Sequence, residues 1–249
     1  MAQNRLGDLH QPALARLGLV VVSRITILLM SLAKEISANG FVFLKEFEPT
    51  QESLEAFQLL GIVEYLEGLN AIQALKPRSN SEAEPNTYSR IFGKSEFPMH
   101  TDLAHWAVPP RYLALRCVHG SSTIRTNLLD GTAVSSEFGL EILQSTLVRP
   151  RRPMRNSRQL FRLVEPTDDA PHIRFRWDSQ FLEPASSLAE EIFLALVSFI
   201  ALIKPEHVVL RDPGDTLIID NWLWLHGRTS ADSISNLRHV DRGYLSFLV

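Results

Sequence analysis

The chain has 249 residues, of which 45% are hydrophobic and 21% are charged, as is ordinary for a soluble globular protein with one domain and a substantial core. A formal net charge of −3 argues against a nucleic-acid-binding surface as its main function. The single cysteine, Cys117, excludes an intramolecular disulfide and any cysteine-based zinc or iron–sulfur site, and it indicates a reducing, cytoplasmic setting.

The first elements lie in an apolar N-terminal region. Residues 17–33 are short for a membrane span and contain Ser23 and Arg24, so we interpret them as a buried strand, Leu17–Val22, that runs into a helix ending at Gly40. A membrane anchor is the less favoured alternative. A strand over Phe41–Phe47 and a helix that opens at Pro49 are expected next.

The segment 76–98 is polar and rich in residues that break helices and strands, such as Pro77, Asn80 and Pro85. It predicts a long mobile loop. Because it precedes the first candidate metal ligand, it is placed to act as a lid over a substrate.

Beyond this segment the chain consists mainly of short strand-like pieces. One helix is expected, over residues 186–203, because its apolar side chains recur four apart. We predict an α+β, mainly β fold with a jelly-roll core and flanking helices. The arginine-rich stretch 149–158 favours a solvated insertion, with an anion-binding lid as the alternative. The expected strands are Arg111–Val118, Thr126–Leu129, Ile173–Trp177, Val208–Leu210, Thr216–Ile219, Leu223–His226 and Tyr244–Val249.

The first motif with chemical content is His100 and Asp102. Side chains two apart on an extended chain point the same way, so an imidazole and a carboxylate can converge on one cation. Two histidines and one carboxylate on one face of iron(II) leave positions open for co-substrate and oxygen. The motif alone is weak, because a histidine and an aspartate meet at this spacing by chance in many chains.

A second motif near the C-terminus strengthens the metal hypothesis. His226 ends an apolar strand-like run and is followed by Gly227, and Arg238 lies twelve residues further on. An arginine can bind a carboxylate through two parallel hydrogen bonds, as an anionic co-substrate beside a metal would require.

These motifs resemble the taurine dioxygenase and clavaminate synthase-like group of iron(II)- and 2-oxoglutarate-dependent oxygenases. The resemblance is specific at His100–Asp102, at Gly214–Thr229 and at Arg238–Tyr244, and looser at Gly40–Leu60 and Thr126–Gly131. It implies a double-stranded β-helix, a jelly-roll variant, over residues 1–249 as one domain. It also implies iron(II) as the metal, with 2-oxoglutarate and O2 as co-substrates.

Carried over by position, the resemblance implies that His100, Asp102 and His226 hold the iron. Arg238 and Thr126 would hold the far carboxylate of 2-oxoglutarate. The family's pair of glycines before this threonine is absent here, so Thr123 stays a rival to Thr126.

Three further residues are candidates for substrate binding. By the same resemblance, Arg242 would clamp an anionic group of the substrate, although an ordinary ion pair on a solvent-facing surface is the alternative. Tyr88 in the expected lid and Trp106 after the metal motif could touch substrate, although aromatic side chains beside strands more often pack.

The implied reaction is hydroxylation of an unactivated C–H bond of a small substrate, anionic or amino-acid-like, with release of succinate and CO2. Such a step would suit natural-product biosynthesis or small-acid catabolism, and the substrate could be carried on a partner protein. Desaturation, epoxidation or cyclisation by the same iron chemistry is an alternative. A cupin-like metal-binding jelly roll without 2-oxoglutarate is another, and a homo-oligomer is conceivable.

Overall fold

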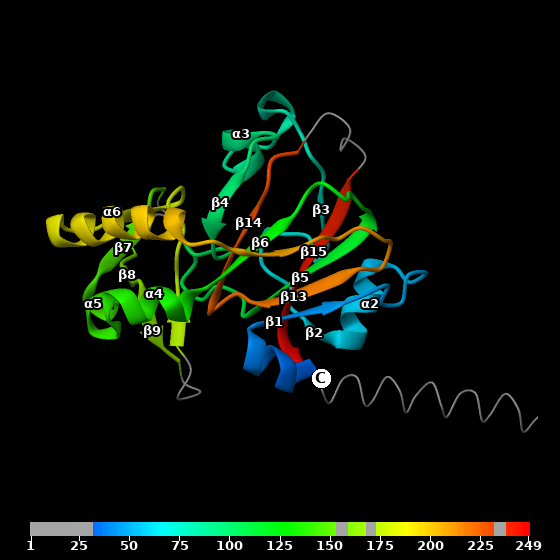
Figure 1. Ribbon diagram of the computed structural model, residues 1–249, viewed down its shortest axis with the longest axis horizontal. Coiled ribbons are helices and arrows are strands. Elements are labelled where there is room, and N and C mark those ends of the chain that lie inside the picture. The colour runs from blue at the N-terminus through cyan, green and yellow to red at the C-terminus, as the bar shows by residue number, and fades with distance from the viewer. Residues whose placement is uncertain (1–31, 153–158, 168–172, 232–237) are drawn as a thin grey trace, which may run out of the picture.

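The computed structural model describes residues 32–152, 159–167, 173–231 and 238–249. Two antiparallel sheets form its centre (Figure 1). In the six-stranded sheet the order is β1-β13-β5-β15-β2, and β3 also pairs with β15. The bounds of these strands are β1 Phe41–Leu44, β2 Gly61–Val63, β3 Gln73–Leu75, β5 Tyr112–His119, β13 Thr216–Asp220 and β15 His239–Leu248.

The four-stranded sheet has the order β12-β6-β14-β4 and carries two of the candidate metal ligands. Its strands are β4 Phe97–His100, β6 Thr126–Asp130, β12 Glu206–Val208 and β14 Trp224–Arg228. This packing follows from the sequence because successive side chains of a strand point to opposite faces of the sheet. Leu113 and Leu115 of β5 lie in a buried cluster with Leu128 of β6 and Trp224 of β14, so this cluster fills the space between the sheets.

The intervening residues of β5 face the other way. Tyr112 and Ala114 pack in a second cluster with Phe57 of α2 (Ser53–Leu60) and with Ile36 from the helical residues 32–39. Helices therefore cover the outer face of the large sheet, and the mainly β jelly-roll prediction is confirmed.

A side lobe packs beside the barrel (Figure 1). Its long helix α6 (Ser187–Leu202) starts where the Ser186 hydroxyl accepts a hydrogen bond from the amide of Ala189, as a serine N-cap should. Its buried residues Phe193 and Leu196 share a cluster with Trp177. The other elements of the lobe are α4 Gly131–Phe138, α5 Leu140–Ser145, β7 Leu147–Pro150, β8 Phe161–Arg162, β9 Val164–Pro166, β10 Ile173–Phe175 and β11 Leu182–Pro184.

Several expected boundaries are wrong. The segment 76–98 is not a loop throughout: it contains the short helices η1 (Asn80–Glu82) and α3 (Tyr88–Phe92), and its last residues begin β4. Asn80 explains the order, since its side-chain amide donates to the carbonyl oxygens of Arg90 and Ile91 and closes this segment on itself.

The arginine-rich stretch also differs from the expected insertion. Arg149 and Pro150 end strand β7, where Arg149 donates to a carboxylate oxygen of Glu183 on β11 at 2.7 Å. Residues 153–158 of this stretch, and the expected strand Leu17–Val22, lie outside the described residues.

Other predictions moved by a few residues. β12 begins at Glu206 rather than Val208, β10 ends at Phe175, and β1 ends at Leu44. β15 begins at His239, ahead of the expected Tyr244, because residues 239–243, several of which are polar, also pair with β5. The helix before Gly40 is confirmed up to residue 39, and Gly40 has the positive φ of 74° that glycine adopts without strain.

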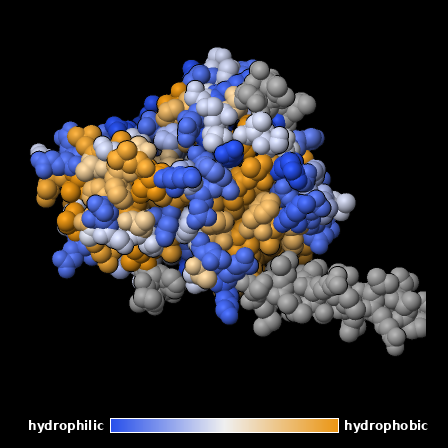
Figure 2. Space-filling model, in the orientation of Figure 1, coloured by the Kyte–Doolittle hydropathy of each residue, from blue (hydrophilic) through white to orange (hydrophobic). Residues whose placement is uncertain are grey.

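Apolar side chains reach the surface on α6 (Figure 2). Leu188, Leu194 and Leu202 are exposed there, Leu202 by 85%. Within the described residues, no helix combines the length and the apolar character that crossing a bilayer needs.

Candidate active site

The three predicted metal ligands meet between two neighbouring strands. His100 at the end of β4 and His226 on β14 are Cα partners, and their ring centroids are 4.4 Å apart. Oδ1 of Asp102 lies 3.5 Å from Nε2 of His100 and 3.7 Å from Nε2 of His226. All three side chains are buried, and one ligand atom from each lies within 4.8 Å of the others.

His100 is oriented as a metal ligand. Its Nδ1 lies 2.9 Å from the carbonyl oxygen of Pro98, which can only accept, so Nδ1 donates and Nε2 is the nitrogen that faces Asp102. Burial opposes the charged form, but the hydrogen bond to Asp102 and its charge raise the pKa of His100 in the metal-free protein, and a bound metal would take the place of the Nε2 proton. Nδ1 of His226 is buried and has no hydrogen-bond partner among the described residues. Burial lowers the pKa of His226, which favours the neutral imidazole that binds a metal.

The two oxygens of Asp102 have different partners. Oδ2 accepts hydrogen bonds from Nη1 of Arg242 at 3.0 Å and from the hydroxyl of Tyr244 at 3.0 Å, whereas Oδ1 faces the two histidines and accepts from the same Nη1 at the longer distance of 3.3 Å. Burial alone would raise the pKa of this carboxyl, but the guanidinium of Arg242 and the hydrogen bonds to both histidines hold it well below its usual range. Asp102 is therefore an ionised, oriented ligand.

Asn221 fixes the backbone of Asp102, and sequence reasoning missed it. Its side-chain oxygen accepts from the amide of Asp102 at 2.6 Å, and its side-chain nitrogen donates to the carbonyl oxygens of Asp102 at 3.0 Å and Pro110 at 2.9 Å. Asn221 follows β13 directly, so the turn before β14 positions Asp102, the ligand that lies just after β4. The position of Asn221 in the motif before His226 is the only feature of the sequence that could indicate this role.

Arg238 and Thr126 lie at one end of the barrel. Thr126 on β6 is buried and is the Cα partner of Arg228, whose pKa is lowered to about 10 by burial and then by the positive charge of Arg238. Nε of Arg238 is buried and no described residue accepts from it, and burial lowers the pKa of Arg238 to about 10. A buried cation of this kind suits an anionic ligand.

Thr123, the rival to Thr126, is exposed in the loop before β6. Its hydroxyl lies 3.1 Å from that of Ser121. Burial and strand position therefore favour Thr126 as the hydroxyl near Arg238.

Two of the three substrate candidates lie against the metal ligands. The ring of Tyr88 stacks on that of His100, with centroids 4.2 Å apart, and its hydroxyl donates to Asp178 at 2.9 Å. Arg242 donates to Asp102 and, through Nη2, to the side-chain oxygen of Gln73 at 2.5 Å. Arg242 does form an ion pair with an acid, as the structural alternative expected, but that acid is the buried Asp102 and not a residue on a solvent-facing surface.

Trp106, the third candidate, is half-buried in the loop after the metal motif. Its carbonyl oxygen accepts from the fully buried Arg176 at 2.6 Å. That contact fixes the backbone of the loop and does not involve the indole, so the substrate role of Trp106 stays a prediction.

The donor set fits iron(II). Two neutral imidazole nitrogens and one carboxylate oxygen, on adjoining strands, form the facial triad that leaves positions open on the metal. An ion at about 2 Å from each donor can span separations of this size. His100, Asp102 and His226 are thus the residues that would hold the metal.

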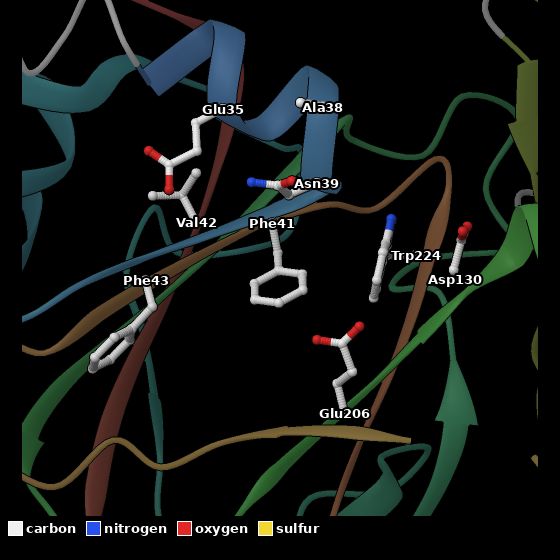
Figure 3. Close-up of a pocket in the computed structure, with 9 residues that line it drawn as sticks. All are labelled: Glu35, Ala38, Asn39, Phe41, Val42, Phe43, Asp130, Glu206 and Trp224. Carbon is white, nitrogen blue, oxygen red and sulfur yellow. The ribbon is translucent and has the colours of Figure 1, made fainter. Parts of the chain in front are cut away.

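The cavity drawn in Figure 3 is a different place. It measures about 550 Å³ and is lined by the aromatic rings of Phe41 and Trp224 and by the carboxylates of Glu35, Asp130 and Glu206. No triad residue lines it. We place the active site at the triad because the buried metal donors are there.

Comparisons with solved structures give the same fold. The PvcB protein from Pseudomonas aeruginosa has a TM-score of 0.62 at 19% identity, covering 87% of this chain and 79% of that one. Asparagine oxygenase has a TM-score of 0.65 at 17% identity over 87% and 76%. The non-heme iron oxygenase OrfP, in complex with Fe and alpha-ketoglutaric acid, has a TM-score of 0.58 at 20% identity over 78% and 63%. At these identities the likeness establishes the fold alone.

The comparison with curated protein sequences found no match. The family model of the taurine catabolism dioxygenase TauD, TfdA family matches residues 30–244, which include the triad, Thr126 and Arg238. The chain therefore belongs to the taurine catabolism dioxygenase TauD, TfdA family and is an iron- and 2-oxoglutarate-dependent oxygenase.

Proposed function

We propose that the protein hydroxylates an unactivated C–H bond of a small amino-acid-like or anionic substrate. The observation that carries the proposal is the buried cluster of His100, Asp102 and His226, at the centre of the stretch that matches the family. Structural neighbours with 3-hydroxyasparagine or 3-hydroxyarginine bound support an amino-acid-like substrate. A cupin-like protein without 2-oxoglutarate is disfavoured by the family match.

Bound iron(II) supplies the oxidising chemistry, in which substrate, O2 and 2-oxoglutarate give hydroxylated product, succinate and CO2. The protein's task is to hold the reactants in register. We assign Arg238 and Thr126 to the far carboxylate of 2-oxoglutarate, where a guanidinium and a hydroxyl provide directed donors.

We assign Tyr88, Trp106 and Arg242 to the substrate side. Tyr88 covers one face of the His100 ring and so excludes water from that side of the metal ligands. Arg242 keeps Asp102 ionised and oriented, and its side chain is 24% exposed, so we assign the guanidinium as a whole to an anionic group of the substrate.

Residues 1–249 are proposed to act as one oxygenase domain in the cytoplasm. A homo-oligomer and a carrier-bound substrate also stay predictions. The exposed leucines of α6 are the face on which a contact between copies would be sought, and sedimentation velocity of the full chain measures it.

The test of the function is O2-dependent release of succinate. The iron-loaded protein is incubated with 2-oxoglutarate and a panel of L-amino acids and small sulfonates, and a hit is confirmed by a product mass increase of one oxygen atom. Arg238→Met should raise the KM for 2-oxoglutarate by about 100-fold or more, because the buried carboxylate would lose its cation. The matched variant Arg125→Met, which removes an exposed arginine beside β6, should leave that KM unchanged. An unaltered KM for 2-oxoglutarate in Arg238→Met would contradict the assignment.

A further inference from the structure

A buried carboxylate that the mechanism above does not use lies beside the metal motif. Asp178 is 2% exposed and follows Trp177. Trp177 is hydrogen-bonded to Thr101, the residue between the two ligands of the motif. The amide of Thr101 donates to the carbonyl oxygen of Trp177 at 2.8 Å, and the amide of Trp177 donates to the hydroxyl of Thr101 at 3.1 Å. Asp178 is therefore fixed next to His100 and Asp102.

Only one of the two oxygens of this carboxylate accepts hydrogen bonds from described residues. Oδ1 accepts from the hydroxyl of Tyr88 at 2.9 Å, from the amide of Gln180 at 2.8 Å and from the amide of Phe181 at 2.9 Å. No described residue donates to Oδ2. Some side-chain atoms of the described residues have no hydrogen-bond partner and are also shut off from solvent, and Oδ2 of Asp178 is not one of them. Because it has no partner, it therefore keeps access to solvent.

Asp178 also has no cationic partner. Among the described residues, none of the lysine, arginine or histidine nitrogens forms an ion pair with it. Burial raises the pKa of Asp178. An unpaired carboxylate in a buried position is unfavourable unless a cation reaches it.

The three donors on Oδ1 do not explain the negative charge. Two backbone amides and a tyrosine hydroxyl would be accepted equally well by the side-chain oxygen of an asparagine. A residue needed only to cap the turn at 178–181 would not have to be ionised. The charge is explained if it serves a ligand.

The surroundings of Asp178 suit a positively charged group. The ring of Phe181 meets Tyr88 edge-on at 5.4 Å and lies 5.6 Å from the ring of His105. Burial lowers the pKa of His105 to about 4, so this histidine is neutral and does not supply the missing cation. Aromatic faces beside a carboxylate favour an ammonium or guanidinium group.

We propose that Asp178 binds the positively charged nitrogen group, ammonium or guanidinium, of an amino-acid-like substrate through Oδ2. The proposal rests on the proposed function and adds the substrate class: a cationic nitrogen held on the His100 side of the metal centre. Tyr88 sets the geometry, because it stacks on His100 while its hydroxyl fixes the other oxygen of Asp178.

The test compares charged probes with neutral analogues, and L-citrulline, which matches L-arginine in shape, separates the loss of charge from the added bulk of an acetyl group. L-Amino acids are paired with their N-acetyl derivatives, L-lysine with Nε-acetyl-lysine, and L-arginine with L-citrulline, and succinate release is measured with the iron-loaded full chain. We expect the charged member of at least one pair to be used and its neutral partner to be poor. Equal use of both members would overturn the proposal.

The variant Asp178→Asn keeps the three hydrogen bonds on Oδ1 and removes the charge. We expect kcat/KM for the charged probe to fall by about 100-fold or more, while the affinity for 2-oxoglutarate, measured without O2, stays unchanged. Asp212→Asn, which removes a surface acid paired with Arg211, is the matched control and should behave as wild type.

Two outcomes separate this proposal from the proposed function. If Asp178→Asn uses the charged probe as well as wild type does, Asp178 does not bind the cation. If the wild-type protein binds iron and 2-oxoglutarate but no charged probe stimulates succinate release, the cationic substrate class is wrong while the oxygenase function stands.

Discussion

Asp102 shows how single residues build the metal site. One of its oxygens is turned toward two histidines, the other is held by Arg242 and Tyr244, and its backbone is held on both sides by Asn221. Loss of a partner that orients a metal ligand typically lowers the metal affinity by about 10- to 100-fold.

Asn221→Ala tests that support. The variant leaves the amide of Asp102 and the carbonyl oxygens of Asp102 and Pro110 without partners, which should cost about 1–3 kcal/mol of folding free energy. Iron(II) affinity should fall by about 10- to 100-fold. Urea unfolding of the metal-free protein and an anaerobic iron titration measure the two effects. Iron affinity equal to wild type would contradict a supporting role, and Asn221→Asp, which keeps only the acceptor, should show an intermediate loss.

Arg242→Met tests the charge on Asp102 through pH. The folded pKa of Asp102 is depressed, so its ionisation contributes stability that is present above its unfolded pKa, about 3.9, and lost as pH falls through the folded value. Without Arg242 the folded pKa should rise, and the gain in unfolding free energy between about pH 2 and about pH 5 should shrink or reverse.

The pH experiment uses metal-free protein and urea unfolding at each pH. Arg125→Met, at an exposed position, is the control and should follow the wild-type curve. A difference between Arg242→Met and wild type that does not change with pH would show that Arg242 acts through packing and not through the charge of Asp102.

Residues of the site differ in how far the sequence predicts them. The triad follows from a short motif and a distal histidine, and both can be recognised in the sequence alone. Asn221, Tyr244 and Asp178 act through contacts with residues more than 85 positions away in the chain, and no local pattern encodes such contacts. Their roles appear only when the fold brings β4, β13 and β15 together.

At the scale of elements, the segment before β4 is tied to the metal-bearing strand β14. The guanidinium of Arg228 lies 3.8 Å from the centre of the Phe97 ring and donates to the carbonyl oxygens of Ser95 at 2.7 Å and Gly93 at 3.2 Å. Arg228 therefore holds the chain between α3 and β4, and α3 carries Tyr88 onto His100.

Arg228→Leu should loosen this segment. Removing a charged donor from two carbonyl oxygens should cost about 1.5–3 kcal/mol, and amide hydrogen exchange over residues 88–100 should accelerate. Exchange measured by mass spectrometry on the full chain checks it, with the exposed Arg211→Leu as control. Unchanged exchange in residues 88–100 would show that Arg228 does not hold the segment.

The elements that the sequence predicts best are those with one regular period. The helix expected over 186–203 and strands such as Thr216–Asp220 agree within a residue or so. The segment 76–98 differs from the expected loop because short polar residues that interrupt helices also cap them: Thr87 accepts from the amide of Arg90 at the start of α3, and Ser79 and Glu82 form a capping box.

At the scale of the molecule, the barrel and the side lobe share a buried arginine. Arg176 is fully buried and donates to the carbonyl oxygens of Ala104 and Trp106 and to the carboxylate of Glu165. The strand expected over Ile173–Trp177 carries two arginines, and its sequence pattern does not indicate that one of them is enclosed. The whole fold encloses it, because the loop after Asp102 supplies carbonyl oxygens around it.

The central claim is that His100, Asp102 and His226 bind iron(II) with 2-oxoglutarate anchored by Arg238. The most direct measurement is the visible spectrum of the purified apoprotein on addition of iron(II) and 2-oxoglutarate without O2. We predict a weak charge-transfer band that is absent in His226→Ala and that requires a higher 2-oxoglutarate concentration in Arg238→Ala. A wild-type protein that binds iron and shows no band would contradict the account.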